Sequence, residues 1–269
     1  MHERGYVKSD VKVKEVQANG DKVIPTVGDN ARGQINRILQ NPEARTQLLR
    51  NLMRLVRKNN YDGLDLNFEL GDPAGQKDYA RFVNQLARRL HQQGKVLSVT
   101  LKAARNRVEE GREMFDYRAL GRSEADRFKV MMYDHNFDAG ADVPGPIAEM
   151  KWVRSSLRYM LRRGLPAHKI HLGLHNYAWT WQQRPDKSYQ LLFPHSTWSA
   201  VHEQVPTLQW DSQAAESYVN YSVKGDNFIS YVGDVRTVKR RLALVKDFGL
   251  AGVVFWTLGR EDPAIYSLF

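Results

Sequence analysis

Six short apolar runs alternate with amphipathic stretches of helical period, and this order leaves few folds open to the chain. The runs predict strands and cover residues 22–27, 63–68, 96–101, 128–133, 169–173 and 252–256. Helices are predicted from Pro42 after its cap Asn41, from Pro73, and over residues 150–163 and 235–248. Strands that alternate with helices pair in parallel, so the pattern predicts an α/β protein.

Two α/β architectures fit this order, an open doubly wound sheet and a (β/α)8 barrel. A barrel needs eight strands, and the residues before the first run predict only a helix, over 7–18. A barrel would therefore lack its first two strands or have them altered. The length of 269 residues suits one large α/β domain, and we expect a single domain over residues 1–269.

Residues 180–233 break the alternation between the fifth predicted strand and the last helix. Trp, Tyr, Ser, Asn and Gln alternate there, as in residues 208–211 and 218–221. This pattern is typical of short antiparallel strands. We therefore expect a small α+β insertion before the last helix and not a second domain.

The composition, with 42% hydrophobic and 26% charged residues, is that of a globular protein. The absence of cysteine excludes disulfides, thiolate metal sites and cysteine nucleophiles. No apolar window is long enough for a transmembrane helix and no apolar run follows the first residues, so we expect neither a membrane span nor a signal peptide in this sequence. The net charge of +10 suits nucleic acid, an anionic wall polymer or a membrane surface. No nucleic-acid-binding motif accompanies the basic residues.

The densest polar cluster in the sequence lies on the second predicted strand, within residues 62–69. Side chains alternate along a strand, so Asp65, Asn67 and Glu69 share one face. Both faces of an ordinary parallel sheet are covered and apolar, and three polar side chains on one face therefore predict a functional site. Glu69 comes last, at the carboxyl end of the strand, where α/β proteins carry their active sites.

The spacing of the two carboxylates limits the reaction. Ordinary glycosidases place two carboxyl groups about 5.5 Å apart for retention or roughly 6.5–9.5 Å apart for inversion. Asp65 and Glu69 lie four residues apart on a strand, roughly 13 Å along the backbone. Glu69 is therefore predicted to be a lone acid, and a nucleophile must come from elsewhere.

The strand resembles the Asp-x-x-Asp-x-Asp-x-Glu signature of glycoside hydrolase family 18, the chitinase-like barrels. It matches at Asp62, Asp65 and Glu69 and departs at Asn67. Four further segments resemble motifs of the family in the same order, and they are residues 130–134, 169–177, 231–236 and 249–259. The details are most similar to the spore-germination and cell-wall branch, whose members cleave N-acetylglucosamine linkages in peptidoglycan.

This resemblance implies a (β/α)8 TIM-type barrel in which residues 22–27 form the third strand. It also implies a retaining hydrolase of N-acetylhexosamine polysaccharides such as peptidoglycan or chitin, without cofactor or metal. The acid protonates the glycosidic oxygen, and the 2-acetamido carbonyl of the substrate attacks the anomeric carbon. The residues expected to carry catalysis are Glu69 as general acid/base, Asn67, Asp65 and Tyr133. Those expected to bind the sugar are Asp134, Tyr177 and Trp256.

Turnover is not assured by the resemblance, because Asn67 replaces a carboxylate. An amide accepts the acetamide hydrogen bond without a charge, and the loss of one electrostatic stabiliser costs on the order of 10²–10³ in rate. The chain is then either an enzyme, as in related endo-acting N-acetylglucosaminidases with Asn at this place, or a chitinase-like binding module that lost turnover. A basic nucleic-acid-binding domain is the third and weakest hypothesis. If the chain is part of a longer exported protein, we expect it outside the cell or in the cell envelope.

Two smaller groups of side chains also allow alternatives. Tyr177, Trp179 and Trp181 either form a sugar-binding platform or pack the insertion. His168, His171 and His175 suggest a metal site at first sight, but only the last two share a strand face, and we expect no metal.

Overall fold

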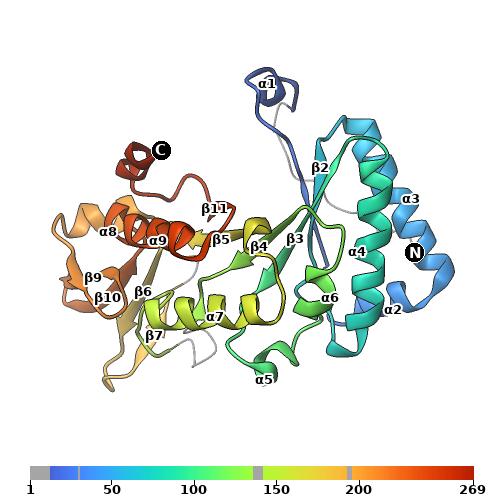
Figure 1. The fold of residues 1–269 in the computed structure, drawn as a ribbon. Helices are drawn as coiled ribbons and strands as arrows, with labels where there is room; N and C mark the ends of the chain where they lie inside the picture. The colour runs from blue at the N-terminus through green and yellow to red at the C-terminus, as the bar shows by residue number, and fades with distance from the viewer. Residues whose placement is uncertain (1–12, 30, 136–141, 193–195) are drawn as a thin grey trace.

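The computed structural model describes residues 13–29, 31–135, 142–192 and 196–269. Its central sheet has six parallel strands in the order β1-β2-β3-β4-β5-β11 (Figure 1). They are β1 Thr26–Gly28, β2 Gly63–Asn67, β3 Val96–Lys102, β4 Arg127–Met131, β5 Ile170–His175 and β11 Gly252–Trp256. Successive strands are neighbours without the reversal of a doubly wound sheet, and the predicted TIM-type fold is confirmed. Within the described residues β1 and β11 do not pair, so the barrel is not closed.

Helices and short helical turns connect these strands. They are α1 Val13–Ala18, α2 Gln34–Gln40, α3 Pro42–Asn59, η1 Pro73–Gly75, α4 Gln76–His91, α5 Arg107–Glu110, α6 Tyr117–Gly121, α7 Met150–Arg162, η3 Ala167–Lys169, α8 Trp198–Gln204, α9 Val235–Phe248 and η4 Pro263–Leu268. Helices α3 and α4 lie side by side near β2, and α9 lies toward the other end of the sheet (Figure 1). Among the described residues, no helix is both long and apolar enough to cross a membrane.

Local sequence signals set the ends of the long helices. The Asn41 side chain accepts hydrogen bonds from two amides in the first turn of α3, where Pro42 lacks a donor that the helix could not use. Helix α9 starts from the Asp234 side chain in the same way and ends at Gly249, whose φ of 63° favours glycine. These predicted helix boundaries are confirmed.

Some predicted strand boundaries differ from the structure by a few residues. The first strand begins at Thr26 and not at residue 22. The preceding residues still contact the next strand, because the Val23 and Pro25 carbonyls accept hydrogen bonds of 2.9 Å from the Asp62 and Asp65 amides. Pro25 has no N–H of its own to add to the ladder. The fourth strand ends at Met131 and the fifth continues to His175. Of the helix predicted over 7–18, residues 7–12 lie outside the described residues.

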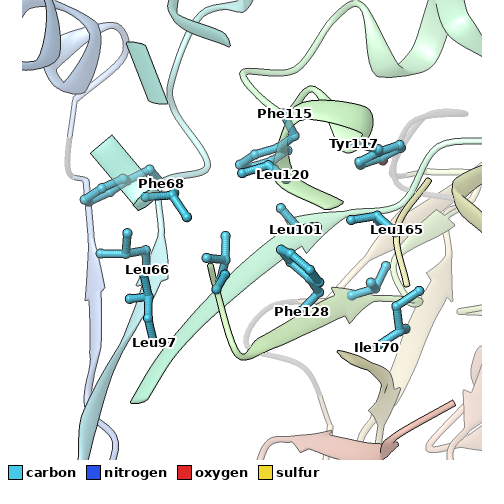
Figure 2. Packing of buried hydrophobic residues seen from close by; sticks show 14 of the residues in the cluster. Leu66, Phe68, Leu97, Leu101, Phe115, Tyr117, Leu120, Phe128, Leu165 and Ile170 are labelled. Atoms are coloured by element: carbon cyan, nitrogen blue, oxygen red, sulfur yellow. The ribbon is translucent and has the colours of Figure 1, made fainter. Parts of the chain in front are cut away.

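The two faces of the central sheet differ in chemistry. Alternate side chains face the helices and form the core shown in Figure 2, and they include Leu64, Leu66, Leu97, Val99, Leu101, Phe128, Val130, Ile170, Leu172 and Leu174. The intervening positions carry polar groups that contact one another, among them Asp65, Thr100 and Lys129. The polar strand face predicted from the sequence is therefore the face that points away from the helices.

The insertion is a five-stranded antiparallel sheet in the order β7-β6-β10-β9-β8. Its strands are β6 Ala178–Gln183, β7 Tyr189–Leu191, β8 Gln209–Asp211, β9 Glu216–Val223 and β10 Asp226–Val232. Together with α8 it forms the predicted α+β unit between β5 and α9, and it begins two residues earlier than expected. One face packs on α8 through Ala178, Val201, Val219 and Val232.

Candidate active site

The carboxyl ends of the parallel strands carry most of the predicted site residues. Glu69 lies two residues after β2, in a turn and not on the strand itself, and it is partly buried. Tyr133 and Asp134 follow β4, Tyr177 follows β5, and Trp256 ends β11. Because the carboxyl ends of parallel strands meet at one edge, the topology places these side chains at the same end of the sheet.

Asn67 is the nearest polar neighbour of the predicted acid. Its Nδ2 donates a hydrogen bond of 2.7 Å to Glu69 Oε1. Its Oδ1 is buried and has no hydrogen-bond partner among the described residues. The amide therefore orients the Glu69 carboxyl with its donor and keeps an acceptor available.

Asp65 lies deeper in the sheet and is only 1% exposed. Its Oδ2 accepts hydrogen bonds from Thr26 Oγ1 at 3.0 Å and Thr100 Oγ1 at 2.9 Å. Lys129 Nζ forms an ion pair with its Oδ1 at 3.4 Å. Asp65 thus joins β1, β2, β3 and β4 from inside the sheet. Its Oδ1 has the charge of Lys129 nearby but no hydrogen bond among the described residues.

Asp134 is held by a tyrosine from the neighbouring strand. Tyr177 Oη donates a hydrogen bond of 2.5 Å to Asp134 Oδ1, and the Tyr133 ring meets the Tyr177 ring edge-on at 6.4 Å between centroids. Burial raises the pKa of Asp134 to about 6; the charge on Glu69 adds to this rise, and the bond from Tyr177 opposes it. Burial also raises the pKa of both tyrosines above their ordinary value, so both phenols stay protonated near neutral pH.

The aromatic side chains of the site divide into buried and exposed ones. Tyr177 and Trp179 are each 1% exposed and Trp181 is fully buried, and the three pack in one cluster with Ile147 and Leu191. They therefore pack the insertion and do not form an exposed sugar platform. Trp256 is 58% exposed at the end of β11, which rules out a plain core role. Its contact with a sugar stays a prediction.

Asp29 is a site residue that the sequence analysis missed. It follows β1 directly, and its Oδ2 accepts a hydrogen bond of 3.0 Å from the Leu70 amide, next to Glu69. Burial raises the pKa of Asp29, and the charge on Glu69 adds to the rise. A carboxylate two residues after the strand predicted over 22–27 was the available signal, but its relation to Glu69 depends on the pairing of β1 with β2.

A buried group of charged and polar side chains next to Tyr177 was also missed, and it consists of Glu216, Arg241 and His175. Glu216 on β9 accepts hydrogen bonds of 2.8 Å from the Ile147 and Ala148 amides and pairs with Arg241 of α9 at 2.7 Å. His175 Nε2 lies 3.5 Å from the Glu216 carboxylate. Burial, with the charge on Arg241, lowers the pKa of His175 well below its ordinary value, so the ring is neutral at pH 7. Among the described residues no group of three or more side chains has the arrangement of a metal site.

Comparisons with known proteins agree with this geometry. The profile of glycosyl hydrolases family 18 matches residues 5–261. The glycosylase YvbX of Bacillus subtilis (strain 168) is 24% identical over 97% of this chain and 74% of its own length. The cortical fragment-lytic enzyme of the same organism is 24% identical over 87% of this chain and 55% of its own length. The chain thus spans about half of that relative.

Solved structures show the same fold. A chitinase from Chromobacterium violaceum ATCC 12472 superposes with a TM-score of 0.81 and is 25% identical, covering 95% of this chain and 81% of that one. The polar strand, the acid at its end and the family profile over nearly the whole chain lead to one assignment. The chain belongs to glycosyl hydrolases family 18 and is a glycosidase.

Proposed function

We propose that this protein hydrolyses β-linked N-acetylglucosamine glycans with retention of configuration, with Glu69 as general acid/base. One observation carries the proposal: Glu69 stands at the carboxyl end of β2 beside a neutral amide, while Asp65 is bound by two threonines and Lys129. Asp65 is therefore not free to attack a sugar. The nucleophile is then the acetamide oxygen of the substrate.

The first step breaks the glycosidic bond. Glu69 gives its proton to the glycosidic oxygen, the acetamide oxygen bonds to the anomeric carbon, and the leaving sugar departs as an alcohol. The product on the enzyme is a cyclic oxazolinium ion. In the second step the Glu69 carboxylate takes a proton from water, whose oxygen attacks the anomeric carbon on the face the leaving group had occupied. The bond between the anomeric carbon and the acetamide oxygen breaks, the neutral acetamide is restored, and the configuration is retained.

Asn67 would orient the acetamide during both steps. Its buried Oδ1 has no hydrogen-bond partner among the described residues, and an acetamide N–H is a fitting donor for it. The opposite end of the Asn67 amide already holds Glu69. One side chain would thus fix both the acid and the attacking group.

The other predicted residues would complete the sugar site. Tyr177 holds Asp134 in place, and Tyr133 lies against Tyr177, so the three form one unit from β4 and β5. The exposed Trp256 ring would support the apolar face of the sugar. Their roles rest on their common position at the carboxyl edge of the sheet.

The substrate class rests on the relatives and on charge. One relative is named a cortical fragment-lytic enzyme and one solved neighbour a chitinase. The net charge of +10 favours an anionic wall polymer such as peptidoglycan. We accordingly expect the protein to act outside the cell or in the cell envelope.

A carbohydrate-binding module is the second candidate, because Asn67 brings no negative charge to the oxazolinium ion. Charge-assisted hydrogen bonds are about twice as strong as neutral ones. Turnover therefore depends on how well the neutral Asn67 amide stabilises the oxazolinium ion.

The test is incubation with chitin oligosaccharides and with peptidoglycan, read by mass spectrometry, with the anomeric form of the first product read by NMR. We expect cleavage by the wild type, a loss of about 10²–10⁴ in rate for Glu69→Gln, and no change for the surface control Glu124→Gln. Binding of the glycans without any product, equal in wild type and Glu69→Gln, would establish the binding module instead. An inverted product would exclude the acetamide as nucleophile.

A further inference from the structure

The peptide group that joins Glu69 to Leu70 lies between two opposite charges. Its N–H donates to Asp29 Oδ2 at 3.0 Å, and its carbonyl oxygen accepts from Lys102 Nζ at 3.4 Å. Asp29 follows β1 and Lys102 ends β3, so the two strands that flank β2 each supply one of these groups.

This peptide needs support because it lies beyond the sheet. Strand β2 ends at Asn67, and its ladder with β1 reaches only as far as the pair Gly28 and Asn67. The direction of the Glu69 side chain therefore depends on the turn that follows. The Leu70 carbonyl accepts from the Gly33 amide at 2.8 Å, which fixes the far end of the same turn.

The charges select one orientation of the peptide plane. A peptide unit has a dipole of about 3.5 D, with its positive end at N–H and its negative end at the carbonyl oxygen. Here the positive end faces the Asp29 carboxylate and the negative end faces the Lys102 ammonium. A flipped peptide would place each end against a like charge, so the flipped form is disfavoured twice.

We propose that Asp29 and Lys102 are positioning residues that clamp the Glu69–Leu70 peptide and thereby fix the direction of the catalytic acid. The inference rests on the proposed role of Glu69. It assigns to Asp29 a contact with the backbone and none with the substrate. Lys102 has the weaker hold, because its contact is longer, its side chain is 38% exposed and it also pairs with Glu113 at 3.4 Å.

The chain offers a matched control at the opposite end of β2. Asp62 Oδ2 accepts from the Val23 amide at 2.8 Å, which is the same kind of carboxylate-to-backbone bond between neighbouring segments. It lies at the amino end of the strand, away from Glu69. A purely structural role predicts the same outcome for Asp29→Ala and Asp62→Ala.

The kinetic test uses Asp29→Ala, Asp29→Asn, Lys102→Met, the double variant Asp29→Ala/Lys102→Met, and Asp62→Ala. We expect kcat on chitin oligosaccharides to fall about 10-fold or more in Asp29→Ala with KM changed less than about 3-fold, since small misplacements of a catalytic group are costly. Asp29→Asn keeps an acceptor for the Leu70 amide but loses the charge that opposes the flipped peptide, so its kcat should lie between those of wild type and Asp29→Ala. Asp62→Ala should lower Tm and leave kcat per folded molecule unchanged. In the double variant the losses should be less than multiplicative.

Amide hydrogen exchange at Leu70 tests the clamp without reference to activity. Exchange at Leu70 should accelerate in Asp29→Ala, accelerate less in Asp29→Asn, and keep its wild-type rate in Asp62→Ala. An unchanged Leu70 rate in Asp29→Ala, or equal kcat values for Asp29→Ala and Asp62→Ala, would overturn the clamp. A wild type that cleaves no glycan would instead remove the proposed function, and the exchange rates would still decide the clamp.

Discussion

Asn67 Nδ2 donates a hydrogen bond of 2.7 Å to Glu69 Oε1, so the immediate neighbour of the acid is a neutral donor. At this position the family signature has an aspartate, which brings a second carboxyl group beside the acid. Asn in place of Asp changes the charge of the site, while the side chain at position 67 still contacts Glu69 directly. Residue 67 is therefore the first position to mutate in a test of the catalytic mechanism.

Asn67→Asp should raise kcat/KM on chitin oligosaccharides about 10-fold or more at mildly acidic pH. Two carboxyl groups at this distance cannot both ionise, so the pair keeps one proton, and its charge would stabilise the oxazolinium ion. The pH profile of kcat/KM is the measurement. Asn67→Ala, which removes donor and acceptor together, should lose activity. A slower Asn67→Asp enzyme at every pH would show that the amide is the better partner here.

Asp134 should make stability depend on pH between about 4 and 6. Its pKa in the folded protein is about 6, above the ordinary value of 3.8, so the folded state binds more protons than the unfolded state in that range. Stability contributed by the protonated form is therefore lost as the pH rises through about 6. Asp134→Asn keeps the acceptor for Tyr177, should flatten this slope and should be more stable at pH 7 by up to about 3 kcal/mol.

Urea unfolding from pH 4 to 7 measures the free energy of unfolding of wild type and Asp134→Asn, with Asp226→Asn at an exposed position as control. Equal slopes in wild type and Asp134→Asn would contradict the expectation.

Lys129→Met should destabilise the protein, because Lys129 is the cation that pairs with the buried Asp65 carboxylate. We expect a loss of about 2–3 kcal/mol, less than for a fully buried pair since the Lys129 side chain is 25% exposed. The exposed Lys77→Met should stay within about 0.5 kcal/mol of wild type in the same urea titration. Adding Asp65→Asn to Lys129→Met should restore part of the loss; a further full loss would mean that the pair is not coupled.

Glu216→Ala should cost about 3–5 kcal/mol, because it leaves Arg241 buried and unpaired. Glu216→Gln retains an oxygen acceptor and should cost less. Both are measured by urea unfolding followed through tryptophan fluorescence, since Trp179 and Trp181 lie in the same insertion as Glu216. Equal stabilities of wild type and Glu216→Ala would show that the pair contributes nothing to the free energy of unfolding.

Much of the barrel could be predicted because its signals are local. The helix caps Asn41 and Asp234 and the terminal Gly249 act within one turn, so their neighbours in sequence suffice to place them. The start of β1 was misplaced because Val23, Ile24 and Pro25 are apolar like the residues of a strand. Regular pairing with β2 begins only at Thr26, and the sequence does not show this.

The site was predictable where alternation along a strand places side chains on one face, as for Asp65 and Asn67 on β2. Glu69 lies in the turn beyond the strand, and its direction depends on contacts that are distant in sequence. The site was not predictable where residues distant in sequence meet. Thr26 and Thr100 contact Asp65 from two other strands, and Asp29 reaches Leu70 from a neighbouring loop. Trp179 and Trp181 are two residues apart on β6 and so share a strand face, which is also the spacing expected for a sugar platform. Only the tertiary packing shows that both side chains are buried.

The Glu216 contacts also bear on how this enzyme could be redesigned. Glu216 belongs to the insertion, Arg241 to the last helix, and the two amides it binds to the segment after β4. An insertion transplanted from another protein would leave Arg241 and these amides without their acceptor. Exchange of substrate range between such enzymes would therefore succeed only when the insertion moves together with the arginine and the loop that it was built to neutralise and bind.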